Sequence, residues 1–269
     1  MQDFDYCRPA SVAEVLTLLR DGVDSKLLAG GQSLLASMKL GLMAPARLIA
    51  LDRIPALRNS CEEQGQLRLG AMQTHGELAA GPALQAWVPG LAQMASHIAD
   101  AQVRAMGTVG GSLANADPAA CWPAGVLALG ATLITDRREI AADDFFTGLF
   151  GTALEPDELL CGLRLRRPRR MAYLKFEQPA SRFALVGVAV AQFDDDGVRV
   201  ALTGTSQGAV RLPAFEQALT RHFDPVALQG LRVDEDLMSA DLHAGADYRA
   251  HLAAVLAGRV VQQALEASK

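Results

Sequence analysis

Two glycine-rich segments constrain the fold of this chain more than any other feature. The first, AGGQS at residues 29–33, follows an apolar run and precedes a helical pattern, which predicts a strand that turns directly into a helix. The second, TVGGS at residues 108–112, adds hydroxyl groups. Because glycine has no Cβ, backbone N–H groups beside it can approach an anion closely, and a helix N-terminus adds partial positive charge. Together the segments indicate a site for a pyrophosphate.

Neither segment matches a standard nucleotide-binding motif. The dinucleotide fingerprint GxGxxG and the phosphate-binding loop GxxxxGK[ST] both differ from them, which disfavours the two folds that carry those motifs. A glycine pair more often reflects simple turn geometry than a ligand site. Each segment alone is therefore weak evidence for phosphate binding.

Hydrophobic periodicity predicts helices and strands that alternate along the first 165 residues. Ser11 and Glu14 form a capping-box pattern for a first helix. A second helix is expected to start at Ser33 and to stop before Pro45, with Leu42 facing inward. Further strands are expected at 26–29, 47–51, 67–70, 132–135 and 159–165, and further helices at 74–80, 90–100 and 119–129.

The pattern changes after a basic, proline-interrupted run at 164–170, which is typical of a boundary. Apolar and alternating stretches at 184–192 and 198–203, joined by a turn at 194–197, predict a β-hairpin. A long closing helix is expected at 247–267. Its apolar face would carry Tyr248, Leu252, Val255 and Leu256.

The composition disfavours several classes of function. A net charge of −5 argues against nucleic acid or an anionic membrane as a partner.

The four cysteines are far apart without a CxxC pair, so no iron–sulfur cluster or structural zinc is expected in this chain. Neither a signal peptide nor a run of about 18 apolar residues is present, and we expect a cytoplasmic protein with free thiols. The five histidines lack metal-binding spacing and are expected at the surface or in packing roles.

Longer motifs surround both glycine segments. They are LLAGGQSLL at 27–35, followed by MKL at 38–40, and MGTVGGSLANADP at 106–118. Further motifs follow in order: FFTG at 145–148, LEPDELL at 154–160, YLKF at 173–176 and ALVGVA at 184–189. In this order the sequence, up to about residue 205, resembles the FAD-binding (medium) subunits of the molybdopterin dehydrogenases, the family of xanthine dehydrogenase and carbon monoxide dehydrogenase.

The resemblance implies an α+β fold of the vanillyl-alcohol-oxidase type, with FAD between two α/β lobes and a C-terminal domain that has a small antiparallel sheet and helices. The implied boundaries are 1–55 for the N-terminal FAD-binding lobe, 56–168 for the middle FAD-binding lobe and 169–269 for the C-terminal domain of the flavin subunit.

The resemblance also implies which residues bind FAD. Leu160 would pack on the isoalloxazine, and Lys175 would lie near its polar edge or near a phosphate. No catalytic side chain and no metal ligand are expected. The implied cofactor-binding residues are Leu27, Leu28, Ala29, Gly30, Gly31, Gln32, Ser33, Leu34, Ile98, Thr108, Val109, Gly110, Gly111, Ser112, Asp117, Leu160 and Lys175.

One position departs from the family pattern. Where the family has Ala-Asp-Leu-Pro, this chain has Ala-Cys-Trp-Pro at residues 120–123, so the carboxylate expected to reach the sugar chain of the flavin is missing. Cys121 is a poor hydrogen-bond acceptor. Either Asp117 or a backbone group takes its place, or the cofactor is held more weakly.

The implied function is electron transfer within an oxidoreductase, a heterotrimeric molybdenum hydroxylase. FAD on this chain would pass electrons from the two-iron two-sulfur clusters of a small subunit to an external acceptor, while a large molybdopterin subunit hydroxylates the substrate. The expected assembly is a dimer of heterotrimers, without nucleic acid and without a membrane span. Two alternatives remain open, a free-standing flavin oxidase or dehydrogenase and a flavin-free scaffold of the same fold. Flavin absorption and copurifying proteins distinguish among the three.

Overall fold

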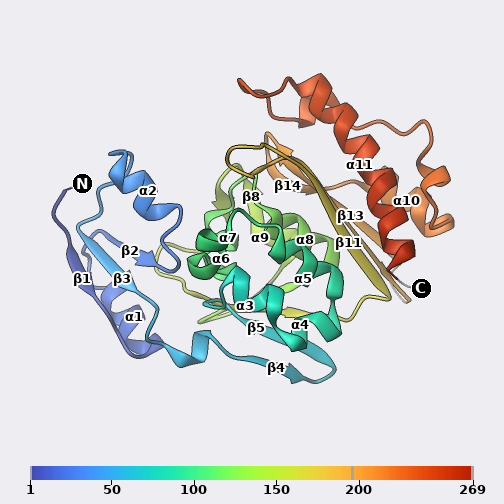
Figure 1. Cartoon of the computed structure of the whole chain (residues 1–269). Helices are drawn as coiled ribbons and strands as arrows, with labels where there is room; N and C mark the ends of the chain where they lie inside the picture. Colours follow the sequence, from blue (N-terminus) through green and yellow to red (C-terminus); the bar gives the residue numbers. More distant parts are fainter. Residues whose placement is uncertain (1, 195–196, 268–269) are drawn as a thin grey trace.

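The computed structural model describes residues 2–194 and 197–267, and the chain folds into three main sheets that follow one another from left to right in Figure 1. The first sheet is parallel, and its strand order places the last strand in the centre. It consists of β1 (Asp5–Cys7), β3 (Arg47–Ala50) and β2 (Ser25–Leu28), with helices α1 (Val12–Leu19) and α2 (Leu34–Lys39) in the crossovers.

The start of α1 and the end of α2 follow from local sequence. The hydroxyl of Ser11 accepts from the backbone N–H of Glu14 at 3.2 Å, so the predicted helix start is confirmed. The predicted inward position of Leu42 is wrong, because α2 ends at Lys39 and the Leu42 side chain is 74% exposed. Gly41, with φ of +73°, turns the chain out of the helix.

The second sheet is antiparallel, and it belongs to the middle region, where most of the helices of the chain lie. Its strands, in spatial order, are β4 (Ser60–Glu63), β5 (Gln66–Gly70), β10 (Leu160–Leu165), β6 (Thr132–Thr135) and β7 (Glu139–Ala141). The helices are α3 (His75–Ala80), α4 (Pro82–Trp87), α5 (Pro89–Ser96), α6 (Ala101–Met106), α7 (Val109–Asn115), α8 (Cys121–Leu129) and α9 (Ala142–Phe145). The region also contains a short 3₁₀ turn (Pro55–Leu57) and a small strand pair, β8 (Phe146–Gly148) and β9 (Gly151–Thr152).

The third sheet is an antiparallel meander in sequence order. It consists of β11 (Arg170–Glu177), β12 (Ala184–Phe193), β13 (Gly197–Thr205) and β14 (Gly208–Arg211), followed by α10 (Pro213–Arg221), 3₁₀ turns Pro225–Leu228 and Glu235–Leu237, and α11 (Ala246–Glu266). The predicted hairpin is confirmed as the β12–β13 pair, although positions 195 and 196 of its turn lie outside the described residues.

Helices cover both faces of the third sheet. α5 and α8 contact it from the middle region, while α10 and α11, the orange and red helices at the right of Figure 1, contact it from the other side. All nine residues of α8 are buried, because this helix packs on β12, β13 and β14 and is covered by α5, α7 and α9. A strand covered on both faces is apolar along its length rather than alternating, which explains the composition of β12.

The buried face of α11 differs from the predicted one. Leu256 is buried, but Tyr248 is 46% exposed. The helix instead presents small side chains to the sheet, among them Ala250, Ala253 and Ala257. Small residues let the helix approach β11 and β12 closely, and this packing decides the orientation.

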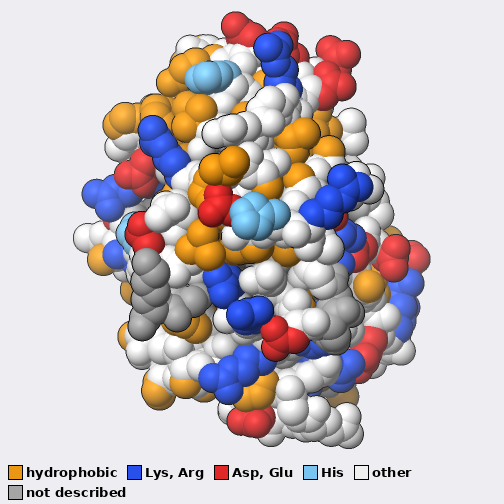
Figure 2. Space-filling model, turned by 90° about the vertical axis from the view of Figure 1, so that its right-hand side faces the viewer, with side chains coloured by type: hydrophobic (Ala, Val, Ile, Leu, Met, Phe, Trp, Pro, Cys, Tyr) orange, Lys and Arg blue, Asp and Glu red, His pale blue; other side chains and the backbone are white. Residues whose placement is uncertain are grey.

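The basic run between β10 and β11 carries the chain from the second sheet to the third. Three of its arginines lie over aromatic rings, Arg166 over Phe193, Arg167 over Trp87 and Arg170 over Phe223, at 4.8 to 5.5 Å from the ring centroid. On the face shown in Figure 2, basic and acidic side chains are interspersed. Among the described residues, no helix has the length and apolar character needed to cross a membrane.

Close packing between α5 and β11 predicts opposite effects of one substitution at two helical glycines. A Cβ on Gly90 would lie 2.1 Å from the carbonyl oxygen of Met171, whereas a Cβ on Gly258 of α11 would meet no atom within 4 Å. We expect Gly90→Ala to lower the free energy of unfolding by about 1–3 kcal/mol through forced displacement of α5. Gly258→Ala should raise it by about 0.5–1 kcal/mol, because alanine favours the helix.

Urea unfolding of the two variants beside the parent chain provides the measurement. Equal effects of the two substitutions would contradict the close α5–β11 contact.

Candidate cofactor site

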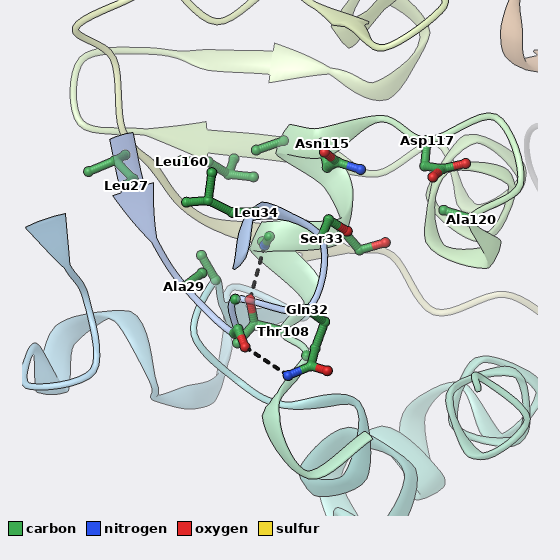
Figure 3. A pocket seen from close by; sticks show the side chains of 18 of the residues that line it. Leu27, Ala29, Gln32, Ser33, Leu34, Thr108, Asn115, Asp117, Ala120 and Leu160 are labelled. Carbon is green, nitrogen blue, oxygen red and sulfur yellow. Dashed lines mark hydrogen bonds between the residues drawn. The ribbon is translucent and has the colours of Figure 1, made fainter. Parts of the chain in front are cut away.

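A cavity of about 620 Å³ separates the first sheet from the middle region. One wall comes from the end of β2 and the turn into α2, and the other from α7, the turn before α8 and the start of β10 (Figure 3). Leu27, Leu34 and Leu160 lie together at one end, and Asp117 and Ala120 lie at the other. The size and the mixture of apolar and polar groups suit a cofactor.

The first glycine segment forms its predicted turn between β2 and α2. Gly31 has φ of +71°, a left-handed conformation that strains any residue with a Cβ. A Cβ on Gly30 would lie 2.2 Å from the carbonyl oxygen of Met106 and 2.7 Å from the Cα of Gly107. The absence of side chains at both positions therefore lets this turn rest directly on the backbone that precedes α7.

The backbone N–H groups of residues 30–34 form a run of free donors. No hydrogen bond within the described part of the chain uses any of these five amides. The side chain of Ser33 makes no capping bond, and the amide of Gln32 folds back to the carbonyl of Gly30 at 3.2 Å. Consecutive unpartnered N–H groups that border a cavity provide binding groups for an anion.

The second glycine segment has a different structure from the one expected. It is the first turn of α7, with Thr108 as the N-cap whose hydroxyl accepts from the N–H of Gly111 at 3.1 Å. The amides of Val109 and Gly110 donate to the carbonyls of Gln73 and Ala71, and that of Ser112 donates to Thr108. These four N–H groups are already satisfied, so the predicted role of this segment as a backbone phosphate loop is corrected.

The glycines of the second segment allow α7 to pack closely and keep the cavity open. A Cβ on Gly110 would lie 2.5 Å from the Cβ of Ala71, so this glycine lets α7 lie against the end of β5. A Cβ on Gly111 would face Ala29 at 3.4 Å across the narrow part of the cavity. The hydroxyls of Thr108 and Ser112 remain at the cavity wall as polar groups.

Buried polar groups lie at the end of the cavity near α8. Burial raises the pKa of the Asp117 carboxyl and of the Cys121 thiol. Asp117 accepts from the backbone N–H of Ala119 at 2.8 Å, which fixes the turn before α8. Lys175 donates to the carbonyl of Arg182 and lies 3.5 Å from Glu177, so its ammonium holds the segment between β11 and β12 beside the cavity.

Nearly all the predicted site residues line this cavity, and two do not. Leu28 follows Leu27 on β2, and successive strand residues point to opposite faces, so only Leu27 faces the cavity. Val109 is fully buried in the hydrophobic core beneath α7. The fifteen predicted residues that do line the cavity are Leu27, Ala29, Gly30, Gly31, Gln32, Ser33, Leu34, Ile98, Thr108, Gly110, Gly111, Ser112, Asp117, Leu160 and Lys175.

Several lining residues were not anticipated. His75, expected only at the surface or in packing, is buried and also lines the cavity, where it accepts a hydrogen bond from Trp122 at 3.0 Å. Asn115 lies at the end of α7, and Phe183 follows Lys175 across the β11–β12 turn. The capping box at Thr74 fixes the start of α3, but nothing local indicates that the next residue meets Trp122.

Comparison with known proteins supports the family resemblance that the sequence motifs indicate. Residues 2–167 match the family described as the FAD binding domain in molybdopterin dehydrogenase. The chain is 35% identical to the carbon monoxide dehydrogenase medium chain of Hydrogenophaga pseudoflava over 98% of its own length and 96% of the relative's. It is 34% identical to the nicotine 6-hydroxylase medium subunit of Paenarthrobacter nicotinovorans, covering 96% of each chain.

Solved structures of related enzymes have the same fold as this chain. A chain of the carbon monoxide dehydrogenase from Hydrogenophaga pseudoflava superposes with a TM-score of 0.90 at 35% identity, with 98% of each chain covered. A chain of the reconstituted enzyme from Oligotropha carboxidovorans gives 0.91 at 32% identity, again with 98% coverage of each. The mixed helix-and-sheet fold is thus that of these medium chains, and the protein is an oxidoreductase with FAD as its cofactor. The chain belongs to the FAD-binding subunits of the molybdopterin dehydrogenases.

Proposed function

We propose that FAD binds in this cavity with its diphosphate at the amides of residues 30–34, and that the chain relays electrons from the two-iron two-sulfur clusters of a partner subunit to an external acceptor. The run of five unpartnered N–H groups carries the proposal, since a diphosphate matches such a run in charge and in hydrogen bonding. Bound FAD supplies the electron chemistry, and the chain positions it.

The remaining lining residues have separable roles in this proposal. Leu27 and Leu160 offer an apolar surface for a flat ring system. The hydroxyls of Thr108 and Ser112 face the diphosphate from the opposite wall. Lys175 acts mainly by holding the segment that contains Phe183, because its charge is already partnered by Glu177. Asp117 is the carboxyl nearest in sequence to Cys121, where the family pattern has aspartate.

We propose that the cavity divides two lobes of a vanillyl-alcohol-oxidase type of fold, with boundaries near residues 55 and 168. Support comes from the change of sheet between Leu165 and Arg170 and from the distinct core of the first lobe, whereas the core of the middle region continues across residue 168 to Met171 and Tyr173. The first core also takes in Met72 and Leu159, so the two lobes share apolar contacts beside the cavity.

The proposed assembly is a dimer of heterotrimers with a small iron–sulfur subunit and a large molybdopterin subunit. Support comes from relatives that are named medium chains or medium subunits of dehydrogenases. All four cysteines are free thiols, in keeping with a reducing cytoplasm. A free-standing flavin oxidase would instead show substrate turnover by the purified chain alone, and a flavin-free scaffold would show no flavin absorption.

A charge placed at Ser33 tests the diphosphate site. Ser33 is exposed to the cavity and its side chain has no capping bond, and both aspartate and asparagine are accepted before a helix. We expect Ser33→Asp to weaken FAD binding at least about tenfold relative to Ser33→Asn, because only the carboxylate repels a phosphate. Fluorescence titration of the apoprotein with FAD measures both. Equal affinities of the two variants would remove residues 30–34 from the diphosphate site.

The flavin is expected to be held without a covalent bond. The groups that could attach it are constrained: His75 is hydrogen-bonded to Trp122, and burial raises the pKa of the Cys121 thiol, which keeps it from forming the nucleophilic thiolate. Acid precipitation of the yellow protein should release all its flavin into the supernatant. Colour that stays in the pellet would contradict this expectation.

Partner subunits can be tested by affinity purification of the full chain from its native cell. We expect a cysteine-rich iron–sulfur protein and a large molybdopterin protein to copurify in equal amounts with the chain. A chain that is recovered alone, carries flavin and reduces oxygen with its own substrate would instead support the free-standing oxidase.

A further inference from the structure

His75 and Trp122 form a buried polar pair behind the cavity wall. Trp122 is fully buried and His75 is 5% exposed, and the two lie 47 residues apart in sequence. The indole Nε1–H of Trp122 donates to Nδ1 of His75 at 3.0 Å, with 6.2 Å between the ring centroids. Since an indole N–H can only donate, the hydrogen bond has a single possible direction.

This direction determines the protonation of the imidazole. A nitrogen that accepts a hydrogen bond carries no proton, so Nδ1 of His75 is bare. Burial, together with the positive charge of Arg104, lowers the pKa of His75 to about 4, and the ring is neutral near pH 7. A neutral ring with a bare Nδ1 carries its hydrogen on Nε2.

The Nε2 edge of His75 lies where the two glycine segments meet. A Cβ on Gly107 would lie 2.8 Å from Nε2, and a Cβ on Gly30 would lie 2.7 Å from the Cα of Gly107. Among the described residues no hydrogen bond engages Nε2, although the backbone N–H of the same residue donates to Gly107 at 2.9 Å. His75 also lines the cavity beside Gly30 and Thr108.

We propose that His75 is a cofactor-binding residue whose Nε2–H donates to a diphosphate oxygen of FAD, and that Trp122 is a positioning residue that fixes the required tautomer. The inference rests on the proposed function, because the free amides of residues 30–34 set the place of the diphosphate. A neutral donor suits this site, since a buried cation would lose its hydration. The competing role of His75 is packing alone, with the Trp122 bond serving only the core.

Two substitutions at His75 distinguish a hydrogen bond to the diphosphate from a role in packing alone. His75→Gln places an amide nitrogen near the position of Nε2, whereas His75→Asn places an oxygen near Nδ1, keeps the partner of Trp122 and does not reach the cavity. We expect His75→Asn to weaken FAD binding about 10- to 100-fold, the range for a hydrogen bond to a charged group, and His75→Gln to stay within about threefold of the parent chain. Urea unfolding of the apoproteins is measured beside the titrations.

The tautomer itself can be observed directly. In ¹⁵N-histidine-labelled full-length chain, one of the five imidazoles should have the Nε2–H pattern, shift when FAD is added, and change in Trp122→Phe. Trp122→Phe removes the donor to Nδ1 without touching the cavity, so FAD affinity should fall by about two- to tenfold as the tautomers mix. These spectra of the parent chain remain decisive if both His75 variants fail to fold.

The outcomes are distinct. Three results would each overturn the role of His75: tight FAD binding by His75→Asn, losses of FAD affinity in His75→Asn and His75→Gln that only follow losses of stability, or an imidazole of Nδ1–H or charged form at this position. Failure of the parent chain to bind FAD, or equal affinities of Ser33→Asp and Ser33→Asn, would instead overturn the proposed site. The expected results are weak FAD binding by His75→Asn, nearly normal FAD binding by His75→Gln and an FAD-dependent shift of the Nε2–H resonance.

Discussion

The contact between Gly30 and the backbone of Met106 and Gly107 is the constraint on which the cavity depends. Gly30 follows β2 of the first sheet, whereas Met106 and Gly107 join α6 to α7 in the middle region. The two segments can touch only because Gly30 lacks a Cβ, which would lie 2.2 Å from the Met106 carbonyl oxygen. This contact brings the free amides of residues 30–34 opposite the start of α7. It also brings the first sheet beside His75, which supports Gly107 from behind.

The two glycine segments look alike in sequence but differ in their hydrogen bonds. In the first, the amides remain free and Gly31 takes a left-handed conformation. In the second, the amides are used by carbonyls of residues 71 and 73 and by Thr108, so its glycines allow α7 to pack against the sheet. One wall of the cavity therefore offers backbone donors, and the other offers shape and hydroxyls.

The departure at residues 120–123 has two structural consequences. Cys121 is buried beside Tyr173 and Lys175, and no carboxylate takes its place on α8. Trp122 is buried next to it and donates its indole N–H to Nδ1 of His75. The stretch at residues 120–123 thus places a thiol at the cavity and a hydrogen-bond donor to His75 behind the cavity wall.

The sequence alone determined the elements whose signals are local. The helix after Ser11 begins as its capping pattern predicts, the helix expected at 74–80 is present, and the glycine turn after β2 and the β12–β13 hairpin follow from local pattern. The motifs also identified the family, and nearly all the cofactor-binding residues that they imply line the cavity. Only the tertiary structure decided that Leu42 is exposed, that α11 buries its alanines, that the amides of the second glycine segment are occupied, and that Trp122 meets His75. The physical reason is that burial and hydrogen-bond partners are set by residues distant in sequence, whereas capping and turn geometry are set by neighbours.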